Sequence, residues 1–269
     1  MKRCYRTFEI PKRNGKVRTI KDPYPPLKQL QKELVAELKQ AGVVEHEAAH
    51  GFKAGHGCRS CVAVHQDNHF FLKIDLHDFF PTISRQMVAK ALRKERLDLP
   101  HEPGFYAWYF TDTTNHLTQG SPSSPFIANI VLKGFDKSFT NWCNKRGLTY
   151  TRYADDMLIS SDRWFRKESV IETVKAMLPQ FTLAEDKTAM GTNYAPCYHL
   201  GMNISNDNQI KIGWRKKKQI QHIAYLDSIG ELTPAEHNHW KGMLNWYSAV
   251  EPDYFRDNPR FDSLRRWAE

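Results

Sequence analysis

The chain contains 269 residues, enough to bury one large core or one core with a small satellite. Its formal net charge is +9, which favours a polyanionic partner such as nucleic acid. No apolar run approaches the ~20 residues that a membrane span needs, and five cysteines at irregular spacing suit a reducing compartment, so we expect a cytoplasmic protein that does not contact a membrane.

The chain mixes strand patterns with helix patterns. Period-two apolar spacing predicts strands, and apolar residues three or four apart predict helices. We expect, in chain order, strands at 8–11 and 17–20, a helix at 27–38, a loop at 48–60, a strand at 69–75, a helix at 84–94 that Ser84 caps, an aromatic stretch at 105–110, a loop at 119–125, a helix at 126–145, a hairpin at 148–161, a helix at 166–178, strands at 181–184 and 198–204, and basic helices beyond Lys211. Because there is no strict βαβ alternation, the predicted fold class is α+β.

Two adjacent carboxylates, Asp155 and Asp156, stand between apolar flanks, at the tip of the hairpin predicted for 148–161. A further carboxylate, Asp75, ends the apolar strand predicted for 69–75. Like charges that converge repel one another unless a cation lies between them, and Mg²⁺ prefers carboxylate oxygens together with substrate phosphates. These three side chains therefore predict a two-metal site for an in-line phosphoryl displacement.

The positive charge is concentrated in two zones. Residues 1–40 contain eleven Lys and Arg against four Asp and Glu. The second zone consists of Lys211, Arg215, Lys216, Lys217 and Lys218. Together the zones carry a surplus of twelve, so the rest of the chain is net −3. This distribution predicts a nucleic-acid cleft with carboxylates at its floor, and a solvated lysine-rich surface is the alternative.

One cluster has the spacing of a zinc site. It contains two thiols and two imidazoles, at His56, Cys58, Cys61 and His65. The sequence has no second Cys-x-x-Cys, and a turn-rich loop that leads into an apolar helix start explains the segment equally well.

Several sequence blocks follow one another along the chain. They are 5–12 with Arg18-Thr19-Ile20, 50–55 with Arg59-Ser60, 75–83, 119–129, 153–156, 184–188 and the turn Leu200-Gly201. They include a Gln-Gly-x-x-x-Ser-Pro-x-x-x-Asn motif and a Tyr-x-Asp-Asp box. In this order the blocks resemble those of a bacterial retroelement reverse transcriptase of the retron-like or defence-associated group. The resemblance runs from near residue 5 to past residue 250, and the end segments 241–247 and 250–254 look retron-like.

The resemblance implies a right-hand polymerase with fingers and palm over 1–210 and a short helical thumb over 211–269. The implied activity is RNA-directed DNA polymerisation, in which two Mg²⁺ ions help to add dNTPs to a 3′-hydroxyl. Asp75 and Asp155 would hold the ions, Asp156 would help to hold the first, and the Leu76 carbonyl would be available to the second.

The resemblance also assigns residues around the incoming nucleotide. Phe80 would lie under the sugar and exclude a 2′-hydroxyl, with Phe79 as a core residue on the other face. Gln119 would lie over the sugar and base, and Arg18 with Lys16 would reach the triphosphate. Lys187 would donate a proton to the leaving pyrophosphate. The five basic residues from Lys211 to Lys218 would follow the template–primer backbone.

Two departures from retron polymerases concern the template. In place of Asn-Ala-x-x-His, the chain has Cys61-Val62-Ala63-Val64-His65, and in place of Val-Thr-Gly it has His199-Leu200-Gly201. In retron polymerases those motifs are linked to recognition of the dedicated structured RNA. Template identity therefore stays open, and a standard retron enzyme and another defence-associated enzyme remain equal alternatives.

The expected partners are a template RNA with its primer, supplied by one cognate small non-coding RNA, together with dNTPs and a neighbouring effector protein in an anti-phage defence system. Oligomeric state is not predicted. One alternative is a polymerase fold that makes DNA without an external template. A second is a non-catalytic RNA-binding scaffold, against which the intact set of three carboxylates argues.

Overall fold

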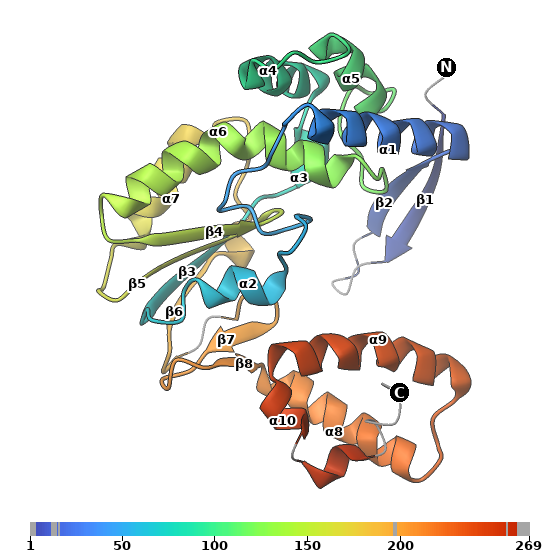
Figure 1. Ribbon diagram of the computed structural model, residues 1–269. Helices are drawn as coiled ribbons and strands as arrows, with labels where there is room; N and C mark the ends of the chain where they lie inside the picture. Colours follow the sequence, from blue (N-terminus) through green and yellow to red (C-terminus); the bar gives the residue numbers. More distant parts are fainter. Residues whose placement is uncertain (1–3, 12–14, 16, 196–197, 257, 263–269) are drawn as a thin grey trace.

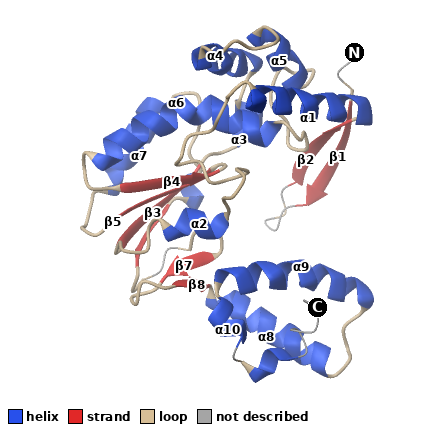
Figure 2. Ribbon diagram, viewed as in Figure 1, coloured by secondary structure: helices blue, strands red, loops and turns tan. Residues whose placement is uncertain are grey.

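The computed structural model describes residues 4–11, 15, 17–195, 198–256 and 258–262. Lys16, one of the two basic residues predicted to contact the triphosphate, lies outside the described residues. The described chain combines antiparallel strands with many helices, which confirms the α+β prediction (Figure 2).

A four-stranded sheet occupies the middle of the molecule (Figure 1). Its strands, in the order β4-β5-β3-β6 and all antiparallel to their neighbours, are β3 (Phe70–Asp75), β4 (Thr149–Tyr153), β5 (Asp156–Ser161) and β6 (Ala189–Thr192). The tight turn between β4 and β5 is the predicted acidic hairpin tip, and Ala154 in it has a left-handed φ of 56°.

The two faces of this sheet belong to different cores, because successive side chains of a strand point to opposite faces. Leu72 and Ile74 of β3 pack in the larger core, whereas Phe71 packs in the second core. Strand β5 follows the same rule, with Ile159 in the larger core and Leu158 in the second. The central strands therefore connect the two cores.

Helices cover the face of the sheet that belongs to the larger core, with α6 and α7 lying along the strands in Figure 1. The helices of this core include α3 (Phe79–Thr82), α4 (Arg85–Glu95), α5 (Pro103–Phe110), α6 (Ser124–Asn144) and α7 (Lys167–Met177). Among them, α4 packs on α6, and α5 packs on α4 farther from the sheet (Figure 1). The predicted cap of α4 is confirmed, since Ser84 Oγ accepts a hydrogen bond from the Met87 amide at 3.3 Å. Among the described residues, no helix is long and apolar enough to cross a bilayer.

The N-terminal hairpin stands at the edge of the molecule beside α1 (Figure 1). Its strands are β1 (Tyr5–Pro11) and β2 (Val17–Pro23), which precede α1 (Pro25–Gln40). Residues 6–11 and 17–19 are exposed, and burial begins only toward the base, at 20–23 of β2 and at Tyr5 of β1. Most of the hairpin therefore projects into solvent.

The second core joins a small hairpin to the C-terminal helices. Its elements are α2 (Cys58–Ala63), β7 (Met202–Ile204), β8 (Ile210–Ile212), α8 (Trp214–Ser228), α9 (Pro234–Val250), α10 (Pro252–Arg256) and the 3₁₀ turn η2 (Pro259–Phe261). Pro234 and Pro252 are the first residues of α9 and α10, a position where proline is favoured. The boundary predicted between residues 210 and 211 falls inside β8 and stays a prediction.

Several short elements differ from the sequence predictions. Residues 181–184 are not a strand, because their alternating burial comes from loop contacts and a single bridge between Leu183 and Leu76. Of the predicted strand 198–204, only Met202–Ile204 forms a strand, and His199 makes a single bridge to Met202. Strand β6 was not predicted, since the sequence Ala-Met-Gly-Thr lacks both alternation and β-branched residues before its end. The predicted loop 48–60 contains the start of α2.

Candidate active site

The three predicted carboxylates converge at one end of the central sheet. Asp75 is the last residue of β3, and its partner in the β3–β5 register is Asp156, the first residue of β5. Asp155 occupies the turn that precedes β5, and its backbone carbonyl accepts a hydrogen bond from the Leu76 amide at 3.0 Å. The pairing of β3 with β5 and this hydrogen bond together place Asp75, Asp155 and Asp156 at the ends of adjacent strands.

The carboxylates are crowded and poorly solvated. Burial, followed by the charges of Asp156 and Asp75, raises the pKa of Asp155 to about 6. Burial also raises the pKa of Asp156 above its ordinary value, although the Lys73 ammonium opposes that shift. Repulsion between these groups means that the site favours a cation.

Two lysines supply positive charge to the carboxylates. Lys187 Nζ lies 2.8 Å from Asp75 Oδ1 and 3.0 Å from Asp75 Oδ2. Lys73 Nζ lies 3.4 Å from Asp156 Oδ1. Although partial burial opposes its charge, the bond to Asp75 raises the pKa of Lys187, so its ammonium remains protonated. Lys187 is the residue predicted as a proton donor, whereas Lys73 was not predicted, even though its place two residues before Asp75 on the strand is visible in the sequence.

The oxygen atoms at this site fit a hard divalent cation. Asp156 Oδ1 is buried, and its ion-pair partner among the described residues is Lys73 Nζ at 3.4 Å. Burial and then the charges of Asp156 and Asp75 raise the pKa of Asp155, so a further cation would be favoured here. Among the described residues, no group of three or more Asp, Glu, His or Cys side chains is arranged so that it could hold a metal ion. Both carboxylate oxygens of Asp75 are bonded to Lys187. Binding of a divalent cation between Asp75 and Asp155 would therefore require Lys187 to move aside.

A buried ion pair supports the acidic turn from beneath. Both side chains, Arg152 of β4 and Asp136 of α6, are 0% exposed. Arg152 Nε donates to Asp136 Oδ1 at 2.9 Å, and Nη2 donates to Oδ2 at 2.6 Å. Burial opposes the charge of Arg152, but Asp136 raises the pKa of the guanidinium above its ordinary value. Arg152 Nη1 also donates to the Ala154 carbonyl at 2.9 Å, so the ion pair reaches the turn itself.

Two further motif residues meet at the same turn. Asn129 of α6 accepts from Arg152 Nη1 at 3.1 Å and donates to the Gly51 carbonyl at 2.8 Å. A Cβ atom on Gly51 would lie 2.7 Å from the Ala154 backbone nitrogen, so only glycine allows this approach. The blocks at 50–55, 119–129 and 153–156, far apart in sequence, therefore converge on the residue before Asp155.

The two adjacent phenylalanines of α3 have different environments. Phe79 is 3% exposed and belongs to the larger core, while Phe80 is partly exposed and packs against the edge of that core. Their ring centroids lie 5.2 Å apart. Of the two rings, Phe80 is therefore the one that is partly accessible to a ligand.

Gln119 lies in the loop before α6, next to the base of the N-terminal hairpin. Its carbonyl accepts a hydrogen bond from the Lys21 amide at 2.8 Å, and its side chain is partly exposed. Arg18, farther along the same strand as Lys21, is exposed. The predicted base contact and the predicted triphosphate contact therefore belong to two segments that touch at Lys21.

The basic residues around the start of α8 differ in how free they are. Lys211 pairs with Asp207 at 2.8 Å, Lys217 pairs with Glu251 at 2.6 Å, and Lys216 Nζ lies 4.7 Å from the Trp246 ring centroid. Arg215 and Lys218 are exposed, and Lys218 Nζ lies 5.8 Å from the centroid of the Trp214 ring, which is itself 66% exposed. Arg215 and Lys218 are therefore the most available of the five to a phosphate backbone.

The side chains of the alternative zinc cluster have other partners. The His65 ring bridges Ser160 Oγ at 2.5 Å and Thr151 Oγ1 at 2.8 Å, and Cys61 Sγ lies 3.2 Å from the same Thr151 hydroxyl. Burial raises the pKa of Cys61 to about 12. Cys61 and His65 therefore form part of a buried polar network beneath β4 and β5.

The central sheet carries an acidic strand end beside an acidic turn, and long helices cover one of its faces. A projecting hairpin and a separate helical unit flank it. This arrangement is that of the palm of a right-hand polymerase. The sequence matches the family described as reverse transcriptase (RNA-dependent DNA polymerase) over residues 10–204. The chain therefore belongs to the reverse transcriptase family, whose members are RNA-directed DNA polymerases and generally use divalent metal ions.

Curated relatives place the chain near retron enzymes. It is 28% identical to the Retron Ec83 reverse transcriptase of Escherichia coli, over 93% of this chain and 84% of that protein. It is 26% identical to the Retron Ec73 reverse transcriptase of Escherichia coli, over 97% and 88%. It is 36% identical to the Retron Mx162 reverse transcriptase of Myxococcus xanthus, over 58% of this chain and 35% of that protein. The expected resemblance to retron-like reverse transcriptases is confirmed.

Solved telomerase structures share the fold. An apo telomerase from Candida tropicalis, truncated from its C-terminal domain, superposes with a TM-score of 0.55 at 11% identity, over 78% of this chain and 55% of that one. A Candida albicans telomerase gives a TM-score of 0.55 at 13% identity, over 79% of this chain and 45% of that one. The chain thus spans about half of each telomerase chain, and the likeness confirms the right-hand polymerase fold.

We predict that Gly51→Ala slows nucleotide addition while the protein remains folded. The new methyl group must displace the Ala154 backbone, and a shift of about 1 Å at a catalytic group can cost roughly a hundredfold in rate. Single-turnover extension of a primed RNA template would measure the effect, with circular dichroism to monitor folding.

Gly134→Ala provides the control for Gly51→Ala. A Cβ atom at Gly134, within α6, meets nothing within 4 Å, so this variant should gain about 0.4–1 kcal/mol of stability and keep its rate. Equal rates for Gly51→Ala and the parent would show that the turn tolerates the displacement.

Proposed function

We propose that this chain adds dNTPs to a 3′-hydroxyl by copying RNA, at a site where Asp75, Asp155 and Asp156 hold two Mg²⁺ ions. The observation that carries the proposal is the convergence of these three carboxylates on adjacent strand ends of a polymerase palm. In the reaction the 3′-oxygen forms a bond to the α-phosphorus, the bond to the β-phosphate oxygen breaks, and pyrophosphate leaves.

Bound Mg²⁺ would assist loss of the hydroxyl proton and neutralise the leaving pyrophosphate. The chain's own part is to position the carboxylates, since Asp75 and Asp155 would hold the two ions and Asp156 would help to hold the first. The Leu76 carbonyl would be available to the second ion. Lys187, whose ammonium lies 2.8 Å from Asp75 Oδ1, would turn to the pyrophosphate oxygens and donate its proton there.

Nucleotide selection would involve three groups from separate segments. We assign Phe80 to the sugar, Gln119 to the sugar and base, and Arg18 to the triphosphate, where its guanidinium would give bidentate contacts. The partial exposure of Phe80 beside the buried Phe79 supports the first assignment. Lys16 remains a proposed second triphosphate contact.

We propose that the template is one cognate small non-coding RNA, as part of a retron-like anti-phage defence system with a neighbouring effector protein. The support is the resemblance to retron reverse transcriptases and the exposed basic residues at the start of α8.

We also assign the protein to the cytoplasm, because the four described cysteines, Cys4, Cys58, Cys61 and Cys143, carry free thiols.

We predict that Asp155→Asn abolishes nucleotide addition and leaves RNA affinity nearly unchanged. The substitution removes a metal-binding charge but none of the cationic groups that dominate binding to the phosphate backbone. Primer extension with Mg²⁺ and a filter-binding assay would measure the two properties. The control is Asp162→Asn, an exposed carboxylate six residues beyond Asp156, which should retain full activity. Comparable extension by Asp155→Asn and the parent would refute the assignment.

We predict that Phe80→Ala relaxes sugar selection. Loss of the ring opens the space that a 2′-hydroxyl needs, so the efficiency of rNTP incorporation relative to dNTP should rise on the order of tenfold. Competition between rNTP and dNTP at a single template position measures the ratio. Phe79→Leu is the matched control, since its effect should fall on stability. An unchanged ratio in Phe80→Ala would move the selecting contact to another residue.

We predict that DNA bound to the protein purified from cells is a copy of one dominant structured RNA. Sequencing the bound DNA and RNA separates the proposal from its alternative, because an untemplated product would be a homopolymer or a random sequence. RNA recovered as a random sample of the transcriptome would contradict the cognate template.

The same RNA provides a test of the α8 surface. Arg215→Glu with Lys218→Glu should weaken RNA binding and lower its salt dependence, with the log–log slope falling by about 1 for each phosphate that the protein no longer neutralises. Nucleotide selection should not change. Lys175→Glu, on the exposed side of α7, is the control and should bind RNA as the parent does.

A further inference from the structure

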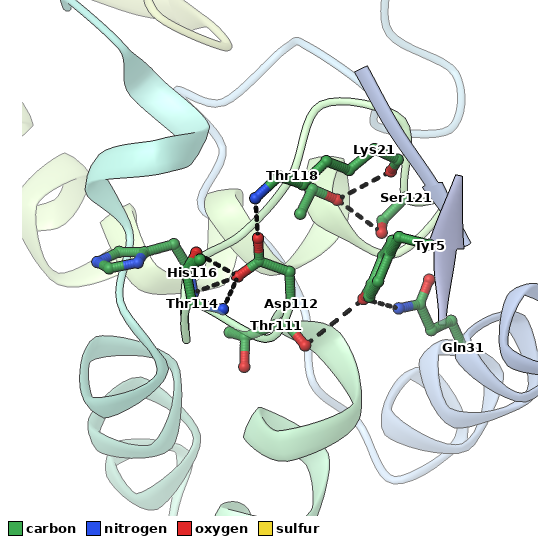
Figure 3. A network of polar contacts seen from close by, with 9 residues as sticks. All are labelled: Tyr5, Lys21, Gln31, Thr111, Asp112, Thr114, His116, Thr118 and Ser121. Atoms are coloured by element: carbon green, nitrogen blue, oxygen red, sulfur yellow. Dashed lines mark hydrogen bonds and ion pairs between the residues drawn. The ribbon is translucent and has the colours of Figure 1, made fainter. Parts of the chain in front are cut away.

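A network of polar contacts attaches the N-terminal hairpin to the loop that carries Gln119 (Figure 3). Lys21, near the end of β2, extends its ammonium to Asp112, and the Nζ–Oδ2 distance is 2.5 Å. The side chain of Asp112 is 2% exposed and that of Lys21 is 32% exposed. The ion pair therefore lies at the base of the hairpin and is largely shielded from water on the acidic side.

The Asp112 carboxylate is held firmly on its own loop. Its Oδ1 atom accepts hydrogen bonds from the Thr114 amide at 2.8 Å, from the Thr114 hydroxyl at 2.6 Å and from the His116 amide at 3.2 Å. Burial would raise the pKa of Asp112, but the bonds from Lys21, Thr114 and His116 lower it below its ordinary value. Asp112 is thus a fixed negative charge to which Lys21 binds.

The backbone of Lys21 is fixed by the segment that leads into α6. Its amide donates to the Gln119 carbonyl at 2.8 Å, and its own carbonyl accepts from Thr118 Oγ1 at 3.4 Å. Thr118 Oγ1 also lies 2.8 Å from Ser121 Oγ. A Cβ atom on Gly120, where φ is 123°, would lie 2.8 Å from the Lys21 carbonyl oxygen, so glycine is required for this approach.

A second set of contacts fixes the other strand of the hairpin at the same level. The Tyr5 hydroxyl donates to the Thr111 carbonyl at 3.5 Å, and Gln31 Nε2 donates to the Tyr5 hydroxyl at 3.2 Å and to the Tyr109 carbonyl at 2.8 Å. Both strands are therefore held at their base, whereas residues 6–11 and 17–19 are exposed. The direction of the projecting part follows from these basal contacts.

Arg18 lies three residues before Lys21 on β2, which corresponds to about 10 Å along the strand. A small rotation at Lys21 would therefore move the Arg18 guanidinium by several times the displacement at the base. Gln119 would move little, because it belongs to the loop that stays with α6. The relative position of Arg18 and Gln119 thus depends on the contacts of Lys21.

We propose that Lys21 and Asp112 are positioning residues for the incoming nucleotide. The pair would hold the hairpin against the Gln119 loop, so that Arg18 and Gln119 bind the triphosphate and the sugar of one dNTP. This role rests on the proposed function of the chain. Neither Lys21 nor Asp112 would touch the nucleotide itself.

The variant Asp112→Asn tests the role with little change in shape. Asn keeps an acceptor for the Thr114 and His116 bonds, but its amide group would face the Lys21 ammonium, where a donor meets a donor. We expect the KM for dNTP on a primed RNA template to rise about tenfold, with kcat changed less than twofold, because binding geometry is lost while the carboxylates stay in place. Lys21→Met should have the same effect.

A neighbouring ion pair supplies the control. Lys28 and Asp22 pair at 2.8 Å at the same end of the hairpin, but neither contacts the Gln119 loop through a described side-chain bond. Lys28→Met should therefore leave the KM for dNTP unchanged. An equal rise in KM for Lys28→Met would overturn the specific role of Lys21 and Asp112.

Combination with Arg18→Gln distinguishes positioning from a general structural role. If the pair acts through Arg18, Asp112→Asn adds no further rise in KM once Arg18 is replaced. An additive rise, an unchanged KM in Asp112→Asn or a fall in kcat alone would each overturn the proposal. A parent protein that adds no dNTP would instead count against the proposed function.

Hydrogen exchange measures the attachment without any need for activity. Amides of β1 and β2 should exchange faster in Asp112→Asn than in the parent, whereas those of β3 and β5 should not change. Identical exchange of the hairpin amides in variant and parent would show that the ion pair does not hold the hairpin, and this result would overturn the proposal whatever the kinetics.

Discussion

The buried pair of Arg152 and Asp136 is the constraint on which the active site depends. Removing two charges from water is costly, so such a pair contributes little net stability to the fold. Substitution of one partner by a neutral residue nevertheless destabilises the protein by about 3–5 kcal/mol, because the other charge stays buried and unpaired. Both side chains are 0% exposed, and two hydrogen bonds join the guanidinium to the carboxylate. The pair joins the long helix α6 to β4, and a hydrogen bond carries the same guanidinium to the Ala154 carbonyl.

This constraint matters because the residues that follow repel one another. Asp155 and Asp156 are adjacent, Asp75 faces them across the sheet, and burial with mutual repulsion raises the pKa of Asp155 to about 6. An acidic turn without support would relax into solvent and separate these charges. Arg152 beneath the turn and Gly51 against its backbone oppose that relaxation, so that part of the folding free energy keeps the carboxylates together.

Local patterns were enough to predict much of the fold and the carboxylates. Flanks rich in β-branched and aromatic residues on both sides of a short acidic turn determine a hairpin within a few residues, and this is why 148–161 was predicted correctly. The pairing of Arg152 with Asp136, or of Lys187 with Asp75, depends on chain segments that meet only after folding. A charged residue inside an apolar strand signals a buried partner without identifying it. The sequence of strand β6 has no strand pattern of its own, and the segment is extended because it pairs with β3.

The positive charges near the carboxylates belong to two kinds, and exposure separates them. Arg152 is 0% exposed and cannot leave without unfolding its surroundings, so its charge is permanent. The side chain of Lys187 is 53% exposed, and its ammonium can exchange its carboxylate partner for water at little cost. In the proposed reaction a divalent cation would replace Lys187 at Asp75, whereas Arg152 would stay beneath the turn. The permanent charge fixes the geometry of the carboxylates, and the replaceable charge leaves them available to the metal ions and phosphates that the proposed reaction requires.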